Sequence, residues 1–233
     1  MVSSRRGMNS AGRTVYQTGY QTGARRLRMA TLFSLAIAFA AAAQGSTAGG
    51  AAARIDVSLD GETYRVRASA QLAADQRVVW DTLTDYEHLR EFIPGVTRAR
   101  VLARAGNQLS IEQVGVFSVF FIDLPVQVRL AVQHIPHTTV LARMEANPAD
   151  AGEPTLRSFS GRYTLSTIRL GQRAGVRLDY DAQFELTRPL PALIGPLFGV
   201  AAVRRTMHAQ FEAMLREIER RQALLDVAEE RAE

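Results

Sequence analysis

Residues 176–186 read Val-Arg-Leu-Asp-Tyr-Asp-Ala-Gln-Phe-Glu-Leu, so that apolar side chains alternate with charged or polar ones. Side chains of a β-strand point to opposite faces in turn, and the stretch therefore predicts a strand with one buried and one solvated face. Such one-sided alternation is typical of antiparallel sheets.

The pattern changes after Pro189, Pro191 and Pro196. Apolar residues then recur at steps of three and four, the spacing of one helix face, in Val200, Val203, Met207, Phe211, Met214 and Ile218. We expect a long helix that runs to about Arg221 or beyond, with a charged tail that frays from Asp226 onward.

Period-two alternation also extends upstream of this strand. It predicts strands over 55–59, 64–68, 96–102, 109–119, 124–132, 140–144 and 159–165. Two helical stretches, 78–83 and 85–92, lie after the second strand and end at Pro94-Gly95. Gly115 and Gly161 lie in mid-strand, where glycine often marks a bend, and they favour a curved sheet. Runs of strands and helices in separate parts of the chain predict an α+β fold.

The N-terminus has the pattern of a targeting segment. Arg25, Arg26 and Arg28 precede an uncharged run, 29–43, that ends in small residues suited to signal peptidase. The run has about 15 residues, whereas a membrane span needs roughly 20. We expect a signal peptide with a long n-region over 1–43, a linker over 44–53, a binding domain over 54–222 and a tail over 223–233. This organisation predicts export across the inner membrane into the periplasm, with an uncleaved N-terminal anchor as the alternative.

Composition excludes several functional classes. The 233-residue chain has no cysteine, which excludes a disulfide framework, a thiolate metal site and a cysteine nucleophile. The net charge of +5 comes from the N-terminus, because residues 1–44 hold six arginines and no acid. The rest has 28 − 6 = 22 arginines against 23 acidic residues, too little positive charge for nucleic-acid binding.

Residues 78–96, Val-Val-Trp-Asp-Thr-Leu-Thr-Asp-Tyr-Glu-His-Leu-Arg-Glu-Phe-Ile-Pro-Gly-Val, resemble the opening of the START-like, helix-grip (SRPBCC) superfamily. More narrowly, they are similar to its polyketide cyclase/dehydrase and coenzyme-Q-binding START-domain branch. The resemblance rests on the Val-Trp pair, the Thr-Asp-Tyr step and the Phe-Ile-Pro exit, and it covers about 54–222.

This resemblance implies a curved antiparallel sheet of about seven strands wrapped around a long C-terminal helix, with two short helices after the N-terminal strands. It also implies an elongated cavity for an apolar ligand such as a lipid, an isoprenoid or quinone, a sterol or a polyketide. A secretory signal departs from the mitochondrial quinone-binding relatives and weakens the quinone interpretation. We expect no cofactor.

Apolar and aromatic residues on the inward strand faces and the helix stripe are the candidate ligand-binding wall. They are Phe92, Phe117, Tyr163, Tyr180, Phe184, Val203, Met207 and Phe211. Periodicity cannot distinguish a hollow interior from one that these side chains fill, and only the resemblance favours the cavity.

Evidence for catalysis in the sequence is weak. No H-E-x-x-H, G-x-S-x-G, Walker or G-x-G-x-x-G motif occurs. His134 and His137 flank Pro136 in a turn and are expected to be solvated, so we predict no metal site. Gln113 shares an inward face with apolar residues, as do the two wall tyrosines, and all three are interpreted as wall residues.

Three functional hypotheses remain. The favoured one is an exported protein that binds or carries an apolar small molecule without catalysis. The second is a cyclase- or dehydratase-type enzyme that uses Tyr163 or Tyr180 with His208. The third is an envelope module whose segment 117–124, apolar on both strand faces, contacts a membrane surface or a partner. The segment 189–198 is either a lid or a plain connection.

Overall fold

The computed structural model describes residues 53–119, 122–145, 154–188 and 195–232. The predicted signal segment 1–43 and nearly all of the linker lie outside these residues and stay predictions. Residues 120–121 of the apolar segment 117–124 and residues 189–194 of the segment 189–198 also lie outside the described residues.

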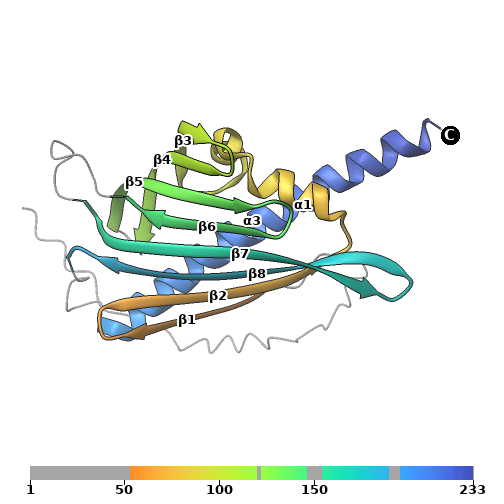
Figure 1. Ribbon diagram of the computed structural model, residues 1–233. Coiled ribbons are helices and arrows are strands. Elements are labelled where there is room, and N and C mark those ends of the chain that lie inside the picture. Colours follow the sequence, from red (N-terminus) through yellow and green to blue (C-terminus); the bar gives the residue numbers. More distant parts are fainter. Residues whose placement is uncertain (1–52, 120–121, 146–153, 189–194, 233) are drawn as a thin grey trace, which may run out of the picture. The chain divides into compact units, whose positions relative to one another are not determined.

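The described chain forms one antiparallel sheet and a set of helices (Figure 1). The strands are β1 (Arg54–Asp60), β2 (Thr63–Leu72), β3 (Val96–Ala105), β4 (Gln108–Val119), β5 (Ile122–Ile135), β6 (Thr139–Met144), β7 (Leu156–Leu170) and β8 (Arg173–Leu186). The helices are α1 (Gln76–Leu83), the 3-10 turn η1 (Tyr86–His88), α2 (Leu89–Phe92) and α3 (Gly195–Glu230). The sheet has eight strands in the order β1-β2-β8-β7-β6-β5-β4-β3. The predicted α+β helix-grip fold is confirmed, with one strand more than the resemblance implied.

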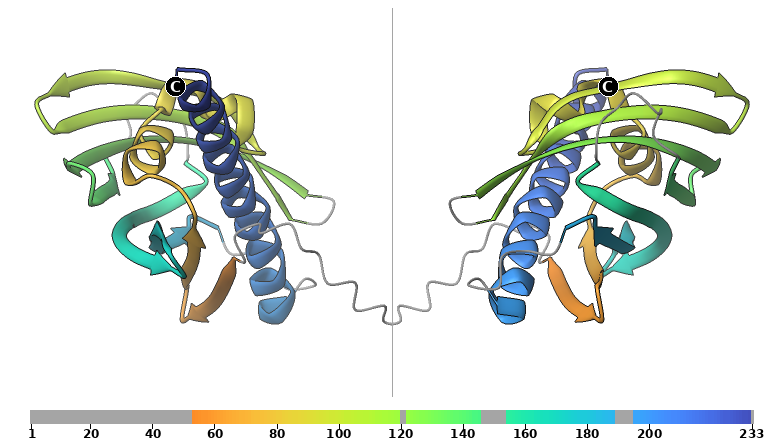
Figure 2. Two further views of the ribbon diagram at one scale, coloured as in Figure 1. Left: turned by 90° about the vertical axis from the view of Figure 1, so that its right-hand side faces the viewer. Right: turned by 90° about the vertical axis from the view of Figure 1, so that its left-hand side faces the viewer.

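Helix α3 lies across the concave side of the sheet in both views of Figure 2. Its main contacts with the sheet are to β1, β2 and β4, and α1 and α2 also pack against it. The helix therefore touches the sheet near its two edges, while the middle strands curve away from it. None of the described helices is both long and apolar enough to span a membrane.

The helical stripe predicted from the sequence faces the interior. Val203, Phe211, Met214 and Ile218 are buried. The helix continues nine residues past Arg221, to Glu230, and so includes the first residues of the charged tail. The fraying of this tail stays a prediction. A hydrogen bond from Gln222 to Asp226, 2.8 Å long, joins side chains one turn apart and supports this last part of the helix.

Close backbone packing requires glycine where α2 leads into β3. Gly95 adopts a positive φ of 84°, a conformation that glycine reaches without steric cost. A Cβ on Gly115 of β4 would lie 2.2 Å from the Gly95 carbonyl oxygen. Gly115 thus lets β4 pass close to the turn between α2 and β3.

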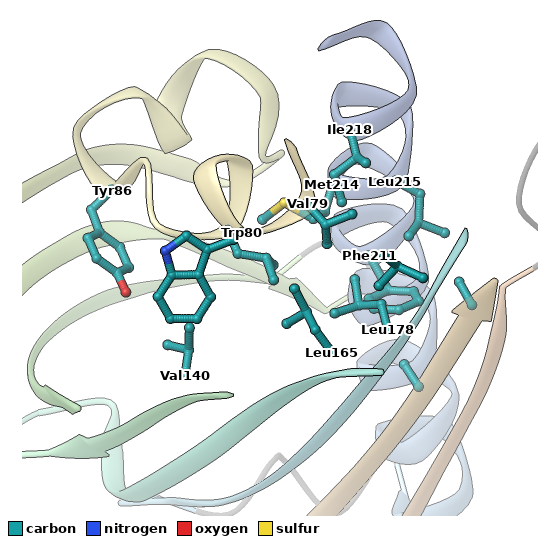
Figure 3. Packing of buried hydrophobic residues seen from close by; sticks show 14 of the residues in the cluster. Val79, Trp80, Tyr86, Val140, Leu165, Leu178, Phe211, Met214, Leu215 and Ile218 are labelled. Carbon is teal, nitrogen blue, oxygen red and sulfur yellow. The ribbon is translucent and has the colours of Figure 1, made fainter. Parts of the chain in front are cut away.

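The core is solid where α1 covers the sheet. Val79, Leu178 and Ile218 have no exposed surface, and Figure 3 shows residues of α1 and α3 meeting those of the sheet. A second, smaller cluster lies around Val57, Val66 and Val203 beside β1 and β2.

Candidate functional site

A cavity of about 280 Å³ lies between the sheet and helix α3. This volume is just below the range of about 300–1,000 Å³ found for small-molecule sites. Its apolar wall includes Ile111, Val126, Val128 and Leu130 of the sheet and Met207, Phe211 and Met214 of α3. The interior is therefore hollow, as the resemblance favoured.

A row of small side chains across the middle strands creates this hollow. Ala142 on β6 pairs with Gly161 on β7, which pairs with Ala182 on β8. All three border the cavity. Because they fill so little volume, the space between helix α3 and the middle of the sheet stays open.

Six of the eight predicted wall residues border the cavity. They are Phe117, Tyr163, Tyr180, Phe184, Met207 and Phe211. Their contact with a ligand stays a prediction.

Phe92 and Val203 are not on the cavity wall, which corrects the sequence-based assignment. Val203 is fully buried in the smaller cluster beside β1 and β2. The Phe92 ring is half-buried, and the Arg221 guanidinium carbon lies 5.6 Å from its centre. Val203 lies in a cluster that shares Val66 and Phe184 with the cavity wall, and Phe92 packs against the larger cluster.

Two tyrosines form the next cross-strand row beside the small residues. Tyr163 on β7 pairs with Tyr180 on β8, and their rings stack with centroids 4.4 Å apart and an angle of 26°. Burial raises the pKa of both hydroxyls. Among the described residues, neither hydroxyl has a hydrogen-bond partner. Both phenols are therefore protonated at neutral pH and free to donate.

The same row of paired residues ends in His134 on β5. Tyr163 pairs with Val140, and Val140 pairs with His134 on β5. His134 Nε2 lies 2.7 Å from the hydroxyl oxygen of Tyr86, which reaches it from η1. The His134 ring also makes an edge-on contact with Trp80, at 5.2 Å between ring centres. His134 is thus half-buried and partnered, so the prediction of a solvated turn residue is wrong.

The environment of this pair sets its protonation. Burial lowers the pKa of His134, and the positive charge of Arg104 acts in the same direction. Burial raises the pKa of Tyr86, which borders the cavity. At neutral pH the imidazole is uncharged, and the Tyr86 hydroxyl donates to Nε2 when that nitrogen is unprotonated.

His208 does not join the tyrosines. It is exposed on α3, and its Nδ1 lies 3.2 Å from a Glu212 carboxylate oxygen, one turn further along. The predicted combination of Tyr163 or Tyr180 with His208 is therefore not formed. The described residues also contain no cluster of three or more His, Asp or Glu residues that could hold a metal ion.

The described wall of the cavity carries no ionised side chain. Besides backbone groups, its polar members are Tyr86, Gln113, Thr155, Tyr163, Tyr180 and Gln210. Gln210 donates to the Pro94 carbonyl oxygen at 3.1 Å and ties α3 to the turn before β3. Thr155 donates to the Pro125 carbonyl oxygen. These two groups have partners within the protein, in contrast to the stacked tyrosines.

A sequence profile described as polyketide cyclase / dehydrase and lipid transport matches residues 72–211. The chain belongs to this family. The matched part runs from the end of β2 to Phe211 and so contains Tyr86, His134, Tyr163 and Tyr180. These four polar residues thus lie within the matched region.

Solved structures of the same fold are similar to this polyketide cyclase / dehydrase family member. TTHA0849 from Thermus thermophilus is 20% identical, with a TM-score of 0.51, over 69% of this chain and 98% of that one. The two-domain aromatase/cyclase StfQ of the steffimycin pathway is 16% identical, with a TM-score of 0.53, over 73% of this chain and 52% of that one. Zhui, an aromatase/cyclase from a Streptomyces species, is 18% identical, with a TM-score of 0.50, over 68% of this chain and 95% of that one.

At such low identities these likenesses establish the fold of the family member and not its activity. No curated protein matches the chain.

Proposed function

We propose that this protein binds an apolar small molecule, of the lipid, isoprenoid or polyketide kind, in the cavity under α3 and carries it without changing it covalently. The observation that supports this most is the hollow itself, which the small residues Ala142, Gly161 and Ala182 keep open. A guest that fills it removes apolar surface from water, at about 25 cal/mol for each Å².

We further propose that the protein does this outside the cytoplasm. The basis is the sequence of residues 25–44, with its basic start, apolar run and small-residue end. Fractionation of the native host and the N-terminal residue of the mature protein test this part separately. A mature chain that begins near Gln44 in the periplasmic fraction is expected, and a cytoplasmic chain that keeps residues 1–43 would contradict it.

The binding proposal is tested on protein purified from its own host. Native mass spectrometry is expected to show a bound species that organic solvent extracts. Ala142→Phe places a ring in the cavity and is expected to abolish the bound species. The matched control is Ala131→Phe, because Ala131 is exposed on neighbouring β5. Its substitution leaves the cavity unobstructed and is expected to keep the bound species. Equal ligand content in both variants would overturn the proposal.

One observation favours a second function, a cyclase- or dehydratase-type enzyme on a polyketide-like substrate. The Tyr86–His134 hydrogen bond of 2.7 Å joins a wall hydroxyl to a neutral imidazole. Such a pair can exchange a proton with a carbonyl compound in the cavity. Turnover of a poly-carbonyl substrate that is lost in Tyr86→Phe and in His134→Gln, with binding retained, would establish it. If the unmodified protein binds the substrate without turnover, the enzyme function is contradicted and only the carrier function remains.

A further inference from the structure

The described cavity wall excludes charge, although the chain is rich in arginine. The ionised residues with well-defined partners lie elsewhere. Glu112, for example, is 3% exposed and meets Arg100 at 2.8 Å and Arg98 at 3.3 Å. It alternates along β4 with the cavity-lining Ile111 and Gln113 and so points to the opposite face of the sheet.

A ligand with an ionised head group would therefore find no counter-ion inside. Moving an isolated carboxylate or ammonium group out of water is far more costly than moving an uncharged polar group. Arg104 is the cation whose charge reaches Tyr86 and His134, but it is exposed and is not part of the wall. The wall thus selects against charged guests.

The tyrosine pair favours a ligand that can accept hydrogen bonds. Polar groups inside folded proteins nearly always have a hydrogen-bond partner, from the protein or from ordered water. The hydroxyls of half-buried Tyr163 and Tyr180 border the cavity and have no partner among the described residues. Gln113 also has none, while Tyr86, Thr155 and Gln210 on the same wall each have one. A carbonyl oxygen has two lone pairs and can accept from both phenols at once.

We propose that the ligand is an uncharged hydrophobic molecule with a carbonyl or hydroxyl oxygen, which Tyr163 and Tyr180 hold by hydrogen bonds. This inference rests on the proposed function and specifies its ligand class. It excludes ionised fatty acids and places no charged lipid head group inside the cavity.

The test compares ten-carbon compounds that differ only at one end. Decane, 2-decanone, 1-decanol and decanoate each compete at pH 7.4 with the fluorescent probe N-phenyl-1-naphthylamine. We expect 2-decanone or 1-decanol to compete about tenfold better than decane, as a gained hydrogen bond permits. Decanoate is expected to compete worse than decane. The ratio of the competing concentrations of the ketone and the alcohol identifies which oxygen the site prefers.

The double variant Tyr163→Phe/Tyr180→Phe is expected to erase the advantage of the oxygen-bearing compounds and leave decane unchanged. Tyr64→Phe is the matched control, because Tyr64 is a buried tyrosine, stacked on Phe184 at 5.1 Å, that does not border the cavity.

Two results would overturn the inference: decanoate competing as well as the ketone, or the double variant keeping the full preference. A different result, in which neither the probe nor any of the compounds binds the unmodified protein, would overturn the proposed function instead. Ala142→Phe checks that the probe reports on the cavity, because the fluorescence of the bound probe must be lost in this variant.

Discussion

Helix α3 meets the sheet in two different ways along its length. At the packed end, defined by Val79, Leu178 and Ile218, large side chains from α1, β8 and α3 leave no exposed surface. At the hollow middle, defined by Ala142, Gly161 and Ala182, small side chains on three neighbouring strands leave a cavity of about 280 Å³. One sheet and one helix thus form both a solid core and a cavity, and side-chain volume decides between them.

Removing side-chain volume is expected to expose this difference most strongly. Ile218→Ala at the packed end should lower the free energy of unfolding by about 2–5 kcal/mol, because it opens a new cavity. Met207→Ala should cost about 1 kcal/mol, because half-buried Met207 already borders a hollow. Urea unfolding of both variants measures the contrast, and equal losses would mean that the middle is as well packed as the end.

Adding side-chain volume should again destabilise the packed end more than the hollow middle. Ala70 is 3% exposed and pairs with Leu178, so Ala70→Phe is expected to cost about 1–3 kcal/mol through overpacking. Ala142→Phe should cost less than about 1 kcal/mol, because its ring enters empty space. Thermal unfolding of the two variants compares them, and a larger loss for Ala142→Phe would contradict the hollow.

The packed end should also depend on pH. Hydrogen bonds from Arg220, and then from Arg221, hold the pKa of Glu217 at about 2, below its ordinary value of 4.5. Arg221 also donates to Asp85 at 2.7 Å, which links α3 to the start of η1. Because the pKa is lower in the folded state, Glu217 stabilises the protein above pH 4.5, and the stabilisation is lost as the pH falls from 4.5 to about 2.

The shift alone corresponds to about 3 kcal/mol. Because the Arg220 side chain is 59% exposed and solvent screens the pair, the loss should amount to about 1–2 kcal/mol for the unmodified protein. Glu217→Gln should be less stable at pH 7 and lose less between pH 5 and pH 2.5. Urea unfolding at several pH values measures how the free energy of unfolding of each protein depends on pH. The same pH dependence in both proteins would show that Glu217 does not contribute.

The smallest effect is expected at the edge of the hollow. Tyr86→Phe removes the partner of His134 Nε2 and should cost about 0.5–1.5 kcal/mol. The pKa of His134, followed by NMR, should change in the variant, while Tyr64→Phe should leave it unchanged. No change in either protein would mean that the hydrogen bond does not form in solution.

The sequence predicted the fold well because alternation and helical spacing are local patterns. The strict alternation over 176–186 lies within β8, and the stripe that ends at Ile218 lies in α3. The position of the cavity along the helix was harder to predict. A stripe shows which face of a helix is buried and not which part of that face borders a cavity, and Val203 was for this reason placed on the wall.

The site was predicted only in part, because its geometry depends on register between strands. Gly161 alone indicated a bend and Ala142 and Ala182 gave no signal, so the row that these three residues form could be seen only from their pairing. His134 had a usable signal, since it has the same parity as inward-facing Val128, Leu130 and Val132 on β5. The nearby Pro136 led to the interpretation as a turn. Tyr86 stood in the Thr-Asp-Tyr motif, but its partner could not be inferred from spacing.

The central claim is that the space between the middle strands and α3 accepts an apolar guest. Crystals of the purified protein under xenon pressure test it directly, because xenon enters dry apolar cavities. We predict a strong anomalous peak next to Ala142, Gly161 and Ala182 that Ala142→Phe removes. Side chains packed against α3 throughout, with no xenon peak there, would contradict the account.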